Sequence, residues 1–201
     1  MEKIIRFPYA KHRGNSIFVL ASVHRVTEKE LIQGCIRLEP EAQKTLYHQY
    51  APLVMGICRR YLKSEEDAED VMVEAMVKVF RSLEDFKGEG SFEGWIRRIS
   101  VHEALMFLRK SRPMEPLESW SASQEAVTDN PEHDFSMHEI LSALDHLPPG
   151  YRAVFNLYVV EGYKHREIAE LLQISINTSK SQLALAKSRM QELLKKFGFG
   201  N

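Results

Sequence analysis

The sequence predicts an all-α protein of two helical domains joined by an acidic linker. Apolar residues recur at intervals of three and four along both parts, and no alternating strand pattern extends beyond a few residues. Between them, residues 113–137 hold six acids, no Lys or Arg and three of the eight prolines, a composition typical of an extended or disordered linker. The predicted divisions are a basic, flexible extension over 1–25, a helical domain over 26–112, the linker over 113–137 and a helical domain over 138–201.

The first helical domain contains three predicted helices. The first covers roughly residues 42–62. The second begins at Ser64, which can cap a helix whose first turn holds Glu66 and Asp67, and extends to about Leu83. Two glycines in KGEGS, residues 87–91, indicate a loop, and the third helix follows over 92–109.

The second helical domain contains four predicted helices. They cover roughly residues 138–147, 151–161, 166–172 and 176–197. LPPG at 147–150 ends the first of them, because proline cannot continue a helix.

The stretch LLQISINTSKSQL, residues 171–183, ends one helix and starts another without Pro or Gly at the break. Ser175 can cap the second helix by accepting a hydrogen bond from the amide of Asn177 or Thr178. A short helix, a tight turn and a longer helix form a helix-turn-helix, whose second helix can enter a major groove with its first turns.

The first two turns of that second helix are polar. Asn and Gln can read adenine edges, and Lys, Ser and Thr can hold phosphates or bases. The candidate DNA-binding residues are Asn177, Thr178, Lys180, Ser181 and Gln182. An αα-hairpin with a solvated polar face is an equally good interpretation of this motif alone.

A second candidate site lies in GEGSFEGWIRRISVHEALMFLRK, residues 88–110. It sets Phe92 and Trp95 beside Arg97, Arg98, Arg109 and Lys110. Single-stranded nucleic acid binds where bases stack on rings and phosphates pair with cations. The alternative is that Trp95 and Ile99 belong to the core and the arginines are solvated; for Trp95 alone this is the better interpretation.

SFEGWIRRI, the helix ending in LRK and the preceding DAEDVMVEAMVKVFRSLEDFKGEG resemble region 2 of RNA polymerase sigma factors of the sigma-70 family. LPPGYRAVFNLYVVEGYKHREIAELLQISINTSKSQLALAKSRM resembles region 4. A short chain with only a linker between these regions is similar to the extracytoplasmic-function (ECF) group. The resemblance covers roughly residues 29–112 and 138–196.

The resemblance implies a transcription initiation factor whose partners are core RNA polymerase, promoter DNA and an anti-sigma factor. Core polymerase would dock on the helix over 70–83, through Asp70, Glu74, Lys78 and Arg81. The segment over 92–109, including His102, would open and read the −10 element. Thr178, Lys180, Ser181 and Gln182 would read the −35 element, and the acidic linker would enter polymerase channels that otherwise hold RNA.

Four positions depart from the family. His102 stands where Asn is frequent, Gln173 where the turn often has Gly, and Gln182 and Leu185 where a basic residue is common. These departures bear on the promoter sequence more than on the class of function. Residues 1–25 match nothing in the family, and are either a flexible extension or a segment before a true translation start near Val26. They lack a periodic apolar face, so we expect them to be dispensable.

The sequence does not favour an enzyme. HEALM and HEILS begin like the zinc motif HExxH, but Met106 and Ser142 replace its second His, and no glycine-rich phosphate loop or GxSxG motif occurs. We therefore expect no catalytic residue, metal or cofactor. The longest apolar run near the N-terminus, residues 17–23, is too short to cross a membrane, and Cys35 and Cys58 form no CxxC pair, so we expect a cytoplasmic protein with reduced thiols.

The rival function is a stand-alone helix-turn-helix regulator. Such a protein needs a markedly basic DNA-binding face, because neutralised phosphates supply most of its non-specific affinity. Residues 138–201 carry eight bases and six acids, a net charge of only +2, within a chain of net charge −1. A sigma factor needs less positive charge on its DNA-binding face, because the polymerase supplies much of the affinity for DNA.

Overall fold

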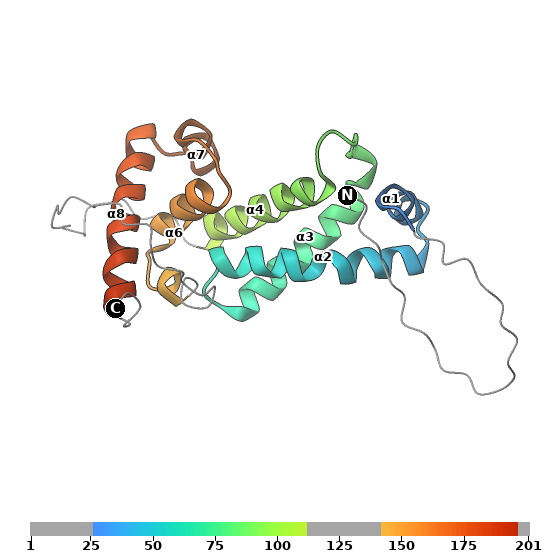
Figure 1. The fold of residues 1–201 in the computed structure, drawn as a ribbon, viewed down its shortest axis with the longest axis horizontal. Helices are drawn as coiled ribbons and strands as arrows, with labels where there is room; N and C mark the ends of the chain where they lie inside the picture. Colours follow the sequence, from blue (N-terminus) through green and yellow to red (C-terminus); the bar gives the residue numbers. More distant parts are fainter. Residues whose placement is uncertain (1–25, 112–141, 197–201) are drawn as a thin grey trace, which may run out of the picture.

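The computed structural model describes residues 26–111 and 142–196, and all regular structure in these two segments is helical. Helices α2 (Pro40–Tyr61), α3 (Glu65–Arg81) and α4 (Phe92–Ser111) lie lengthwise against one another, and α1 (Glu28–Ile36) covers one end of α2 (Figure 1). A single turn of 3-10 helix, Leu83–Asp85, follows α3. The prediction of an all-α protein is confirmed.

Helix α1 was not predicted, although its start is encoded locally. The Thr27 hydroxyl accepts a hydrogen bond from the backbone N–H of Glu30 at 3.2 Å, and the Glu30 carboxylate accepts one from the backbone N–H of Thr27 at 2.7 Å. This reciprocal capping box satisfies two amides that the first turn leaves without partners. Leu31, Ile32 and Cys35 then face the core.

The predicted cap of α3 is confirmed. Ser64 Oγ accepts from the backbone N–H of Asp67 at 3.2 Å, and three acids follow in the first turn, where the helix dipole favours negative charge. The apolar stripe Ala68, Val71, Ala75 and Val79 is fully buried against α2 and α4. The sequence pattern therefore sets both the start and the buried face of this helix.

The C-terminal domain contains α6 (Pro149–Phe155), α7 (His165–Leu172) and α8 (Ile176–Lys196). Of the helix predicted over 138–147, residues 142–145 are helical, and residues before 142 lie outside the described part. LPPG separates it from α6 as predicted, with Pro149 at the start of α6, where a missing N–H is harmless. The extension 1–25 and the linker 113–137 also lie outside the described part.

The helix predicted over 151–161 changes character midway. Residues Asn156–Val160 form a π-helix, which the backbone N–H of Glu161 closes by donating to the carbonyl of Asn156 at 2.9 Å. Local widening of this kind is common at functional sites. It places Glu161 and the loop through Tyr163 against the other domain.

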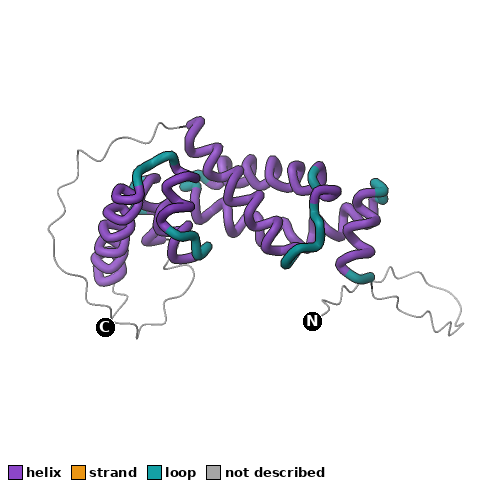
Figure 2. Tube along the Cα trace, turned by 90° about the horizontal axis from the view of Figure 1, so that it is seen from above, coloured by secondary structure: helices purple, strands orange, loops and turns teal. Residues whose placement is uncertain are grey.

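The two domains pack on each other. Val154, Leu157, Ile168, Leu172 and Leu183 belong to the same buried cluster as the cores of α2, α3 and α4. Figures 1 and 2 both show α6 and α7 against one end of the long bundle, with α8 on the outside. A second, smaller cluster, built around Leu144, Leu147 and Met190, holds α8 to its own domain.

Candidate nucleic-acid and polymerase interfaces

The helix-turn-helix consists of α7, the turn 173–175 and α8. Ser175 Oγ accepts from the backbone N–H of Thr178 at 2.9 Å, which confirms the predicted cap. Gln173 ends α7 in the left-handed region, with φ of 55°. A non-glycine residue in this region costs about 1 kcal/mol or more, whereas Gly adopts it without that cost.

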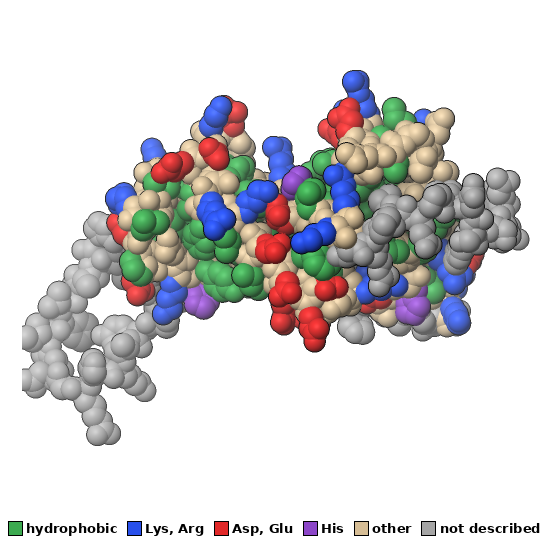
Figure 3. Space-filling view, turned by 180° about the vertical axis from the view of Figure 1, so that it is seen from behind, with side chains coloured by type: hydrophobic (Ala, Val, Ile, Leu, Met, Phe, Trp, Pro, Cys, Tyr) green, Lys and Arg blue, Asp and Glu red, His purple; other side chains and the backbone are tan. Residues whose placement is uncertain are grey.

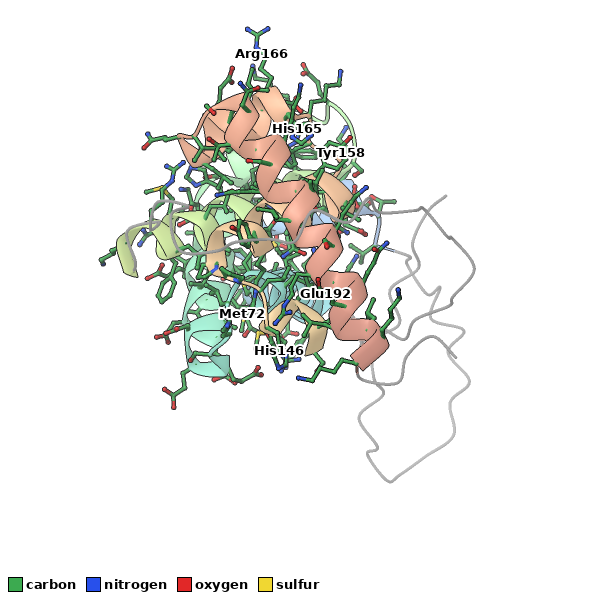
Figure 4. The ribbon with its side chains drawn as sticks, turned by 90° about the vertical axis from the view of Figure 1, so that its left-hand side faces the viewer. Met72, His146, Tyr158, His165, Arg166 and Glu192 are labelled. Carbon is green, nitrogen blue, oxygen red and sulfur yellow. The ribbon has the colours of Figure 1, made fainter. Side chains whose placement is uncertain are left out.

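A side-chain bridge fixes the angle between the two helices. His165 Nδ1, at the start of α7, lies 2.9 Å from Ser179 Oγ in the second turn of α8. The His165 ring stacks on Tyr158 of the π-helix, with centroids 4.7 Å apart. Figure 4 shows both rings beside the upper half of α8, while Arg166 points away from the domain. Burial and the positive charge of Lys180 lower the pKa of His165, which favours the neutral ring.

Of the five residues predicted to contact the −35 element, three are exposed. Asn177, Lys180 and Ser181 face solvent, and Thr178 is half-buried. Gln182, in contrast, is 5% exposed. The prediction that Gln182 reads the −35 element is therefore not supported in this arrangement, because residues 179, 182, 183 and 186 fall on one helical stripe that faces inward.

The aromatic part of the second candidate site lies largely in the core. Phe92 is 1% exposed and contacts Tyr50, Phe86 and Trp95, with ring centroids 5.4, 5.0 and 5.6 Å away. The expectation that Phe92 offers a stacking surface is therefore wrong in this arrangement. Trp95 remains half-buried. Sequence reasoning missed Phe86, whose ring completes the cluster from the preceding loop.

The polar residues of α4 remain more accessible. Arg98 and His102 are exposed, and Arg97 and Arg109 are half-buried. Arg97 lies 3.5 Å from Glu93 and 3.7 Å from Glu161 of the other domain. Trp95, Arg97 and Arg98 thus lie within one turn of α4 but not all on one face, because positions two apart point in different directions. Arg109 lies three turns away.

The predicted polymerase-binding residues share one face of α3. Asp70, Glu74, Lys78 and Arg81 are all exposed and recur at intervals of four and three. Val73 and Val77, which the sequence reasoning did not single out, are 51% and 42% exposed on the same helix.

Lys78 also joins α3 to α4. Its Nζ lies 2.6 Å from Glu103 Oε1, and His102 Nδ1 lies 3.3 Å from the same oxygen. Burial alone would raise the pKa of Glu103, but hydrogen bonds from Lys78 and His102 outweigh it and lower that pKa. The Glu103 carboxylate is therefore held in its charged form.

Acidic side chains form one visible group on the surface. In the view from behind, they gather along the lower edge near the middle of the molecule, while Lys, Arg, Asp and Glu are mixed over the rest of that face (Figure 3). Within the described segments, no group of three or more His, Cys, Asp or Glu side chains could hold a metal ion. None of the described helices is long and apolar enough to cross a membrane.

Comparison with known proteins finds a matching family model for each of the two domains. Residues 46–113 match the family model "Sigma-70 region 2", and residues 137–190 match "Sigma-70, region 4". The chain is 33% identical over 157 residues to the ECF RNA polymerase sigma factor SigE of Mycolicibacterium smegmatis, covering 75% of this chain and 61% of that protein. It is 26% identical over 180 residues to the ECF RNA polymerase sigma-E factor of Haemophilus influenzae, covering 83% and 95% of the two chains.

Among solved structures, the sigma factor RpoE of Bartonella quintana, crystallised with the anti-sigma factor NepR, superimposes with a TM-score of 0.49. The two are 21% identical, and the alignment covers 76% of this chain and 96% of that one. The family matches lie in the same order as the two helical domains, with region 2 on the α2–α4 bundle and region 4 on the helix-turn-helix. The chain therefore belongs to the sigma-70 family of RNA polymerase sigma factors, and within it to the ECF group.

Proposed function

We propose that this chain is a transcription initiation factor that binds core RNA polymerase and directs it to specific promoters. Its proposed partners are core polymerase, promoter DNA and an anti-sigma factor, and its proposed location is the cytoplasm. The observation that carries the proposal is the presence of two family-matched domains, one with an exposed polar turn on α8 and one with adjacent cations on α4. We propose no catalytic step.

Region 2 takes two roles in this proposal. The exposed face of α3 with Asp70, Glu74, Lys78 and Arg81 docks on core polymerase, and Val73 and Val77 add apolar contact area. Trp95, Arg97 and Arg98 on α4 hold the opened −10 strand, the arginines by pairing with phosphates. His102 and Arg109 extend this polar track along α4. Phe92 supports Trp95 from below rather than contacting DNA.

Region 4 reads the −35 element with the first turns of α8. Asn177 and Thr178 are placed to contact base edges, and Lys180 and Ser181 to contact phosphates. Gln182 supports the helix from its buried side. The divisions of the chain are proposed as the extension 1–25, region 2 over 26–112, the linker 113–137 that enters polymerase channels, and region 4 over 138–201.

Run-off transcription with core polymerase and a library of promoters tests this function. We expect the chain to convert core polymerase into an enzyme that starts at a defined subset of the library. A variant tests the docking surface in the same assay. Glu74→Lys reverses the charge of one proposed docking residue on the exposed face of α3, and should reduce transcription from every promoter alike. Transcripts whose pattern is the same with and without the chain would contradict the proposal.

A further inference from the structure

Glu161 joins the two domains through a buried ionic contact. Its carboxylate lies 2.6 Å from a guanidinium nitrogen of Arg60, 101 residues earlier in the chain, and 3.7 Å from one of Arg97. The Glu161 side chain is 2% exposed and that of Arg60 13% exposed. Two cations from α2 and α4 thus enclose one carboxylate from region 4.

Further polar contacts surround this triad. The Asn156 side-chain amide, at the start of the π-helix, donates to the backbone carbonyl of Arg60 at 2.6 Å. Burial and the negative charge of Glu161 raise the pKa of Tyr61, which lies 1% exposed beside Arg60. Tyr163 is near enough to Arg98 that the positive charge opposes the rise that burial causes in the Tyr163 pKa. The segment 156–163 therefore contacts Arg97 and lies near Arg98, which remains exposed.

This arrangement is too compact to span a promoter. The −10 and −35 elements are separated by about 25 base pairs, or roughly 85 Å of duplex. Region 4 as described has 55 residues, and its longest helix, α8 with 21 residues, is about 32 Å long. Because Glu161 contacts Arg97, the exposed turn of α8 lies within about that distance of α4. Region 4 must leave region 2 before both elements can be engaged.

We propose that Glu161 is a latch that holds region 4 on region 2 in the free protein, with its carboxylate occupying at Arg97 the place of a DNA phosphate. This inference rests on the proposed function. A phosphate can then take that place at Arg97 only when region 4 moves away, whereas Arg98 is already exposed in the closed state. The latch gives the free protein a closed state in which Glu161 competes with DNA for Arg97 and an open state in which Arg97 is available to DNA.

An ionic latch is suited to a reversible contact. Buried charges lose hydration, and the attraction between them offsets only part of that loss, so a buried ion pair adds little net stability. On opening, all three groups regain water. Removing only the carboxylate has a different effect, because Arg60 is left buried without its partner, and the closed state is selectively destabilised.

Glu161→Gln tests the latch, with Glu170→Gln as the matched control. Glu170 lies in the same domain, is 72% exposed and, within the described segments, forms its ion pair with Arg166 four residues before it. Spin labels at Glu66→Cys and Gln191→Cys, both exposed, report the distance between domains in the full chain. The native Cys35 and Cys58 are buried, and burial raises the pKa of Cys35 to about 11, so they react slowly with the labelling reagent.

We expect the wild-type chain and Glu170→Gln to give one short, narrow inter-label distance, and Glu161→Gln to give a longer and broader one. The affinity for a single-stranded oligonucleotide of randomised sequence should rise roughly 5- to 30-fold in Glu161→Gln, because the competent fraction rises. The affinity of Glu170→Gln should equal that of the wild type. Unchanged distance and affinity in Glu161→Gln would overturn the latch, as would a long distance in the wild-type chain.

The wild-type chain provides a second measurement that needs no variant to fold. Saturating single-stranded oligonucleotide should lengthen the inter-label distance, because it competes with Glu161 for Arg97. DNA that binds without changing the distance would overturn the latch. Run-off transcription separates this outcome from failure of the proposed function, since an active chain with an unchanged distance is a sigma factor without a latch.

Discussion

The Ser175 hydroxyl oxygen accepts a hydrogen bond from the backbone N–H of Thr178 at 2.9 Å, and this bond starts α8 directly after the turn. It satisfies one of the amides that a helix leaves without partners in its first turn. It also holds Asn177 and Thr178, the first proposed base contacts, in helical geometry.

Replacing this cap should therefore weaken folding. We expect Ser175→Ala to lower the free energy of unfolding by about 1 kcal/mol, and Ser175→Asp to restore it, because Asp is an equally good cap. Urea denaturation followed by circular dichroism measures both variants. Equal stability of Ser175→Ala and the wild type would show that the bond contributes nothing.

Lys180 should contribute a phosphate contact. It is exposed in the second turn of α8, so Lys180→Ala should weaken binding to all −35 sequences and reduce the salt slope by about one. Lys195→Ala is the matched control, because it removes the same charge roughly 22 Å along the same helix. Filter binding of the polymerase complex over a range of salt measures the slope. A salt slope that falls equally in Lys180→Ala and Lys195→Ala would indicate an effect of the overall net charge rather than a phosphate contact by Lys180.

Arg98 should act in promoter opening. Arg98→Ala removes an exposed cation of the proposed −10 site while leaving α3 unchanged, so polymerase binding should be retained and fewer thymines should become unpaired. Permanganate footprinting detects the unpaired thymines, and co-purification checks polymerase binding. Arg37→Ala, an exposed arginine outside α4, is the control. An unchanged footprint would favour a purely solvated Arg98.

Glu103 should make stability depend on pH in the acid range. Its folded pKa is lowered by Lys78 and His102 against the effect of burial, so the stability it contributes is present above the ordinary Glu pKa of about 4.3 and is lost as pH falls through the folded value. Glu103→Gln should be less stable than the wild type above about pH 5 and approach it below about pH 4. Thermal denaturation at several pH values measures the gap. A gap that stays constant through the acid range would contradict the lowered pKa.

Local signals in the sequence predicted much of the fold. The caps at Ser64 and Ser175 and the break at LPPG each depend on residues within one helical turn, and all three are confirmed. Helix α1 was missed although Thr27 and Glu30 form a capping box, because they lie next to a basic extension that shows no apolar periodicity.

The site was less predictable than the fold. Phe92 and Gln182 were assigned to surfaces by residue type, but the packing of neighbouring helices decides which stripe of α4 or α8 is buried. The contact between Arg60 and Glu161 joins residues 101 positions apart, and no local pattern specifies such a pair. The exposed valines of α3, Val73 and Val77, were overlooked because the periodic pattern identifies the buried stripe of a helix but does not show which apolar residues beside that stripe stay exposed.

A gel shift of duplex promoter DNA with the full chain, with and without core RNA polymerase, tests most directly whether the chain acts as a sigma factor. The chain has a net charge of −1, residues 138–201 carry only +2, and the closed arrangement keeps the domains together, so we predict weak duplex binding by the chain alone at physiological salt. Core polymerase should produce a stable, sequence-specific shift, because it spaces two weak contacts over two promoter elements. Tight, sequence-specific binding without polymerase would contradict the sigma-factor function and identify a stand-alone helix-turn-helix regulator instead.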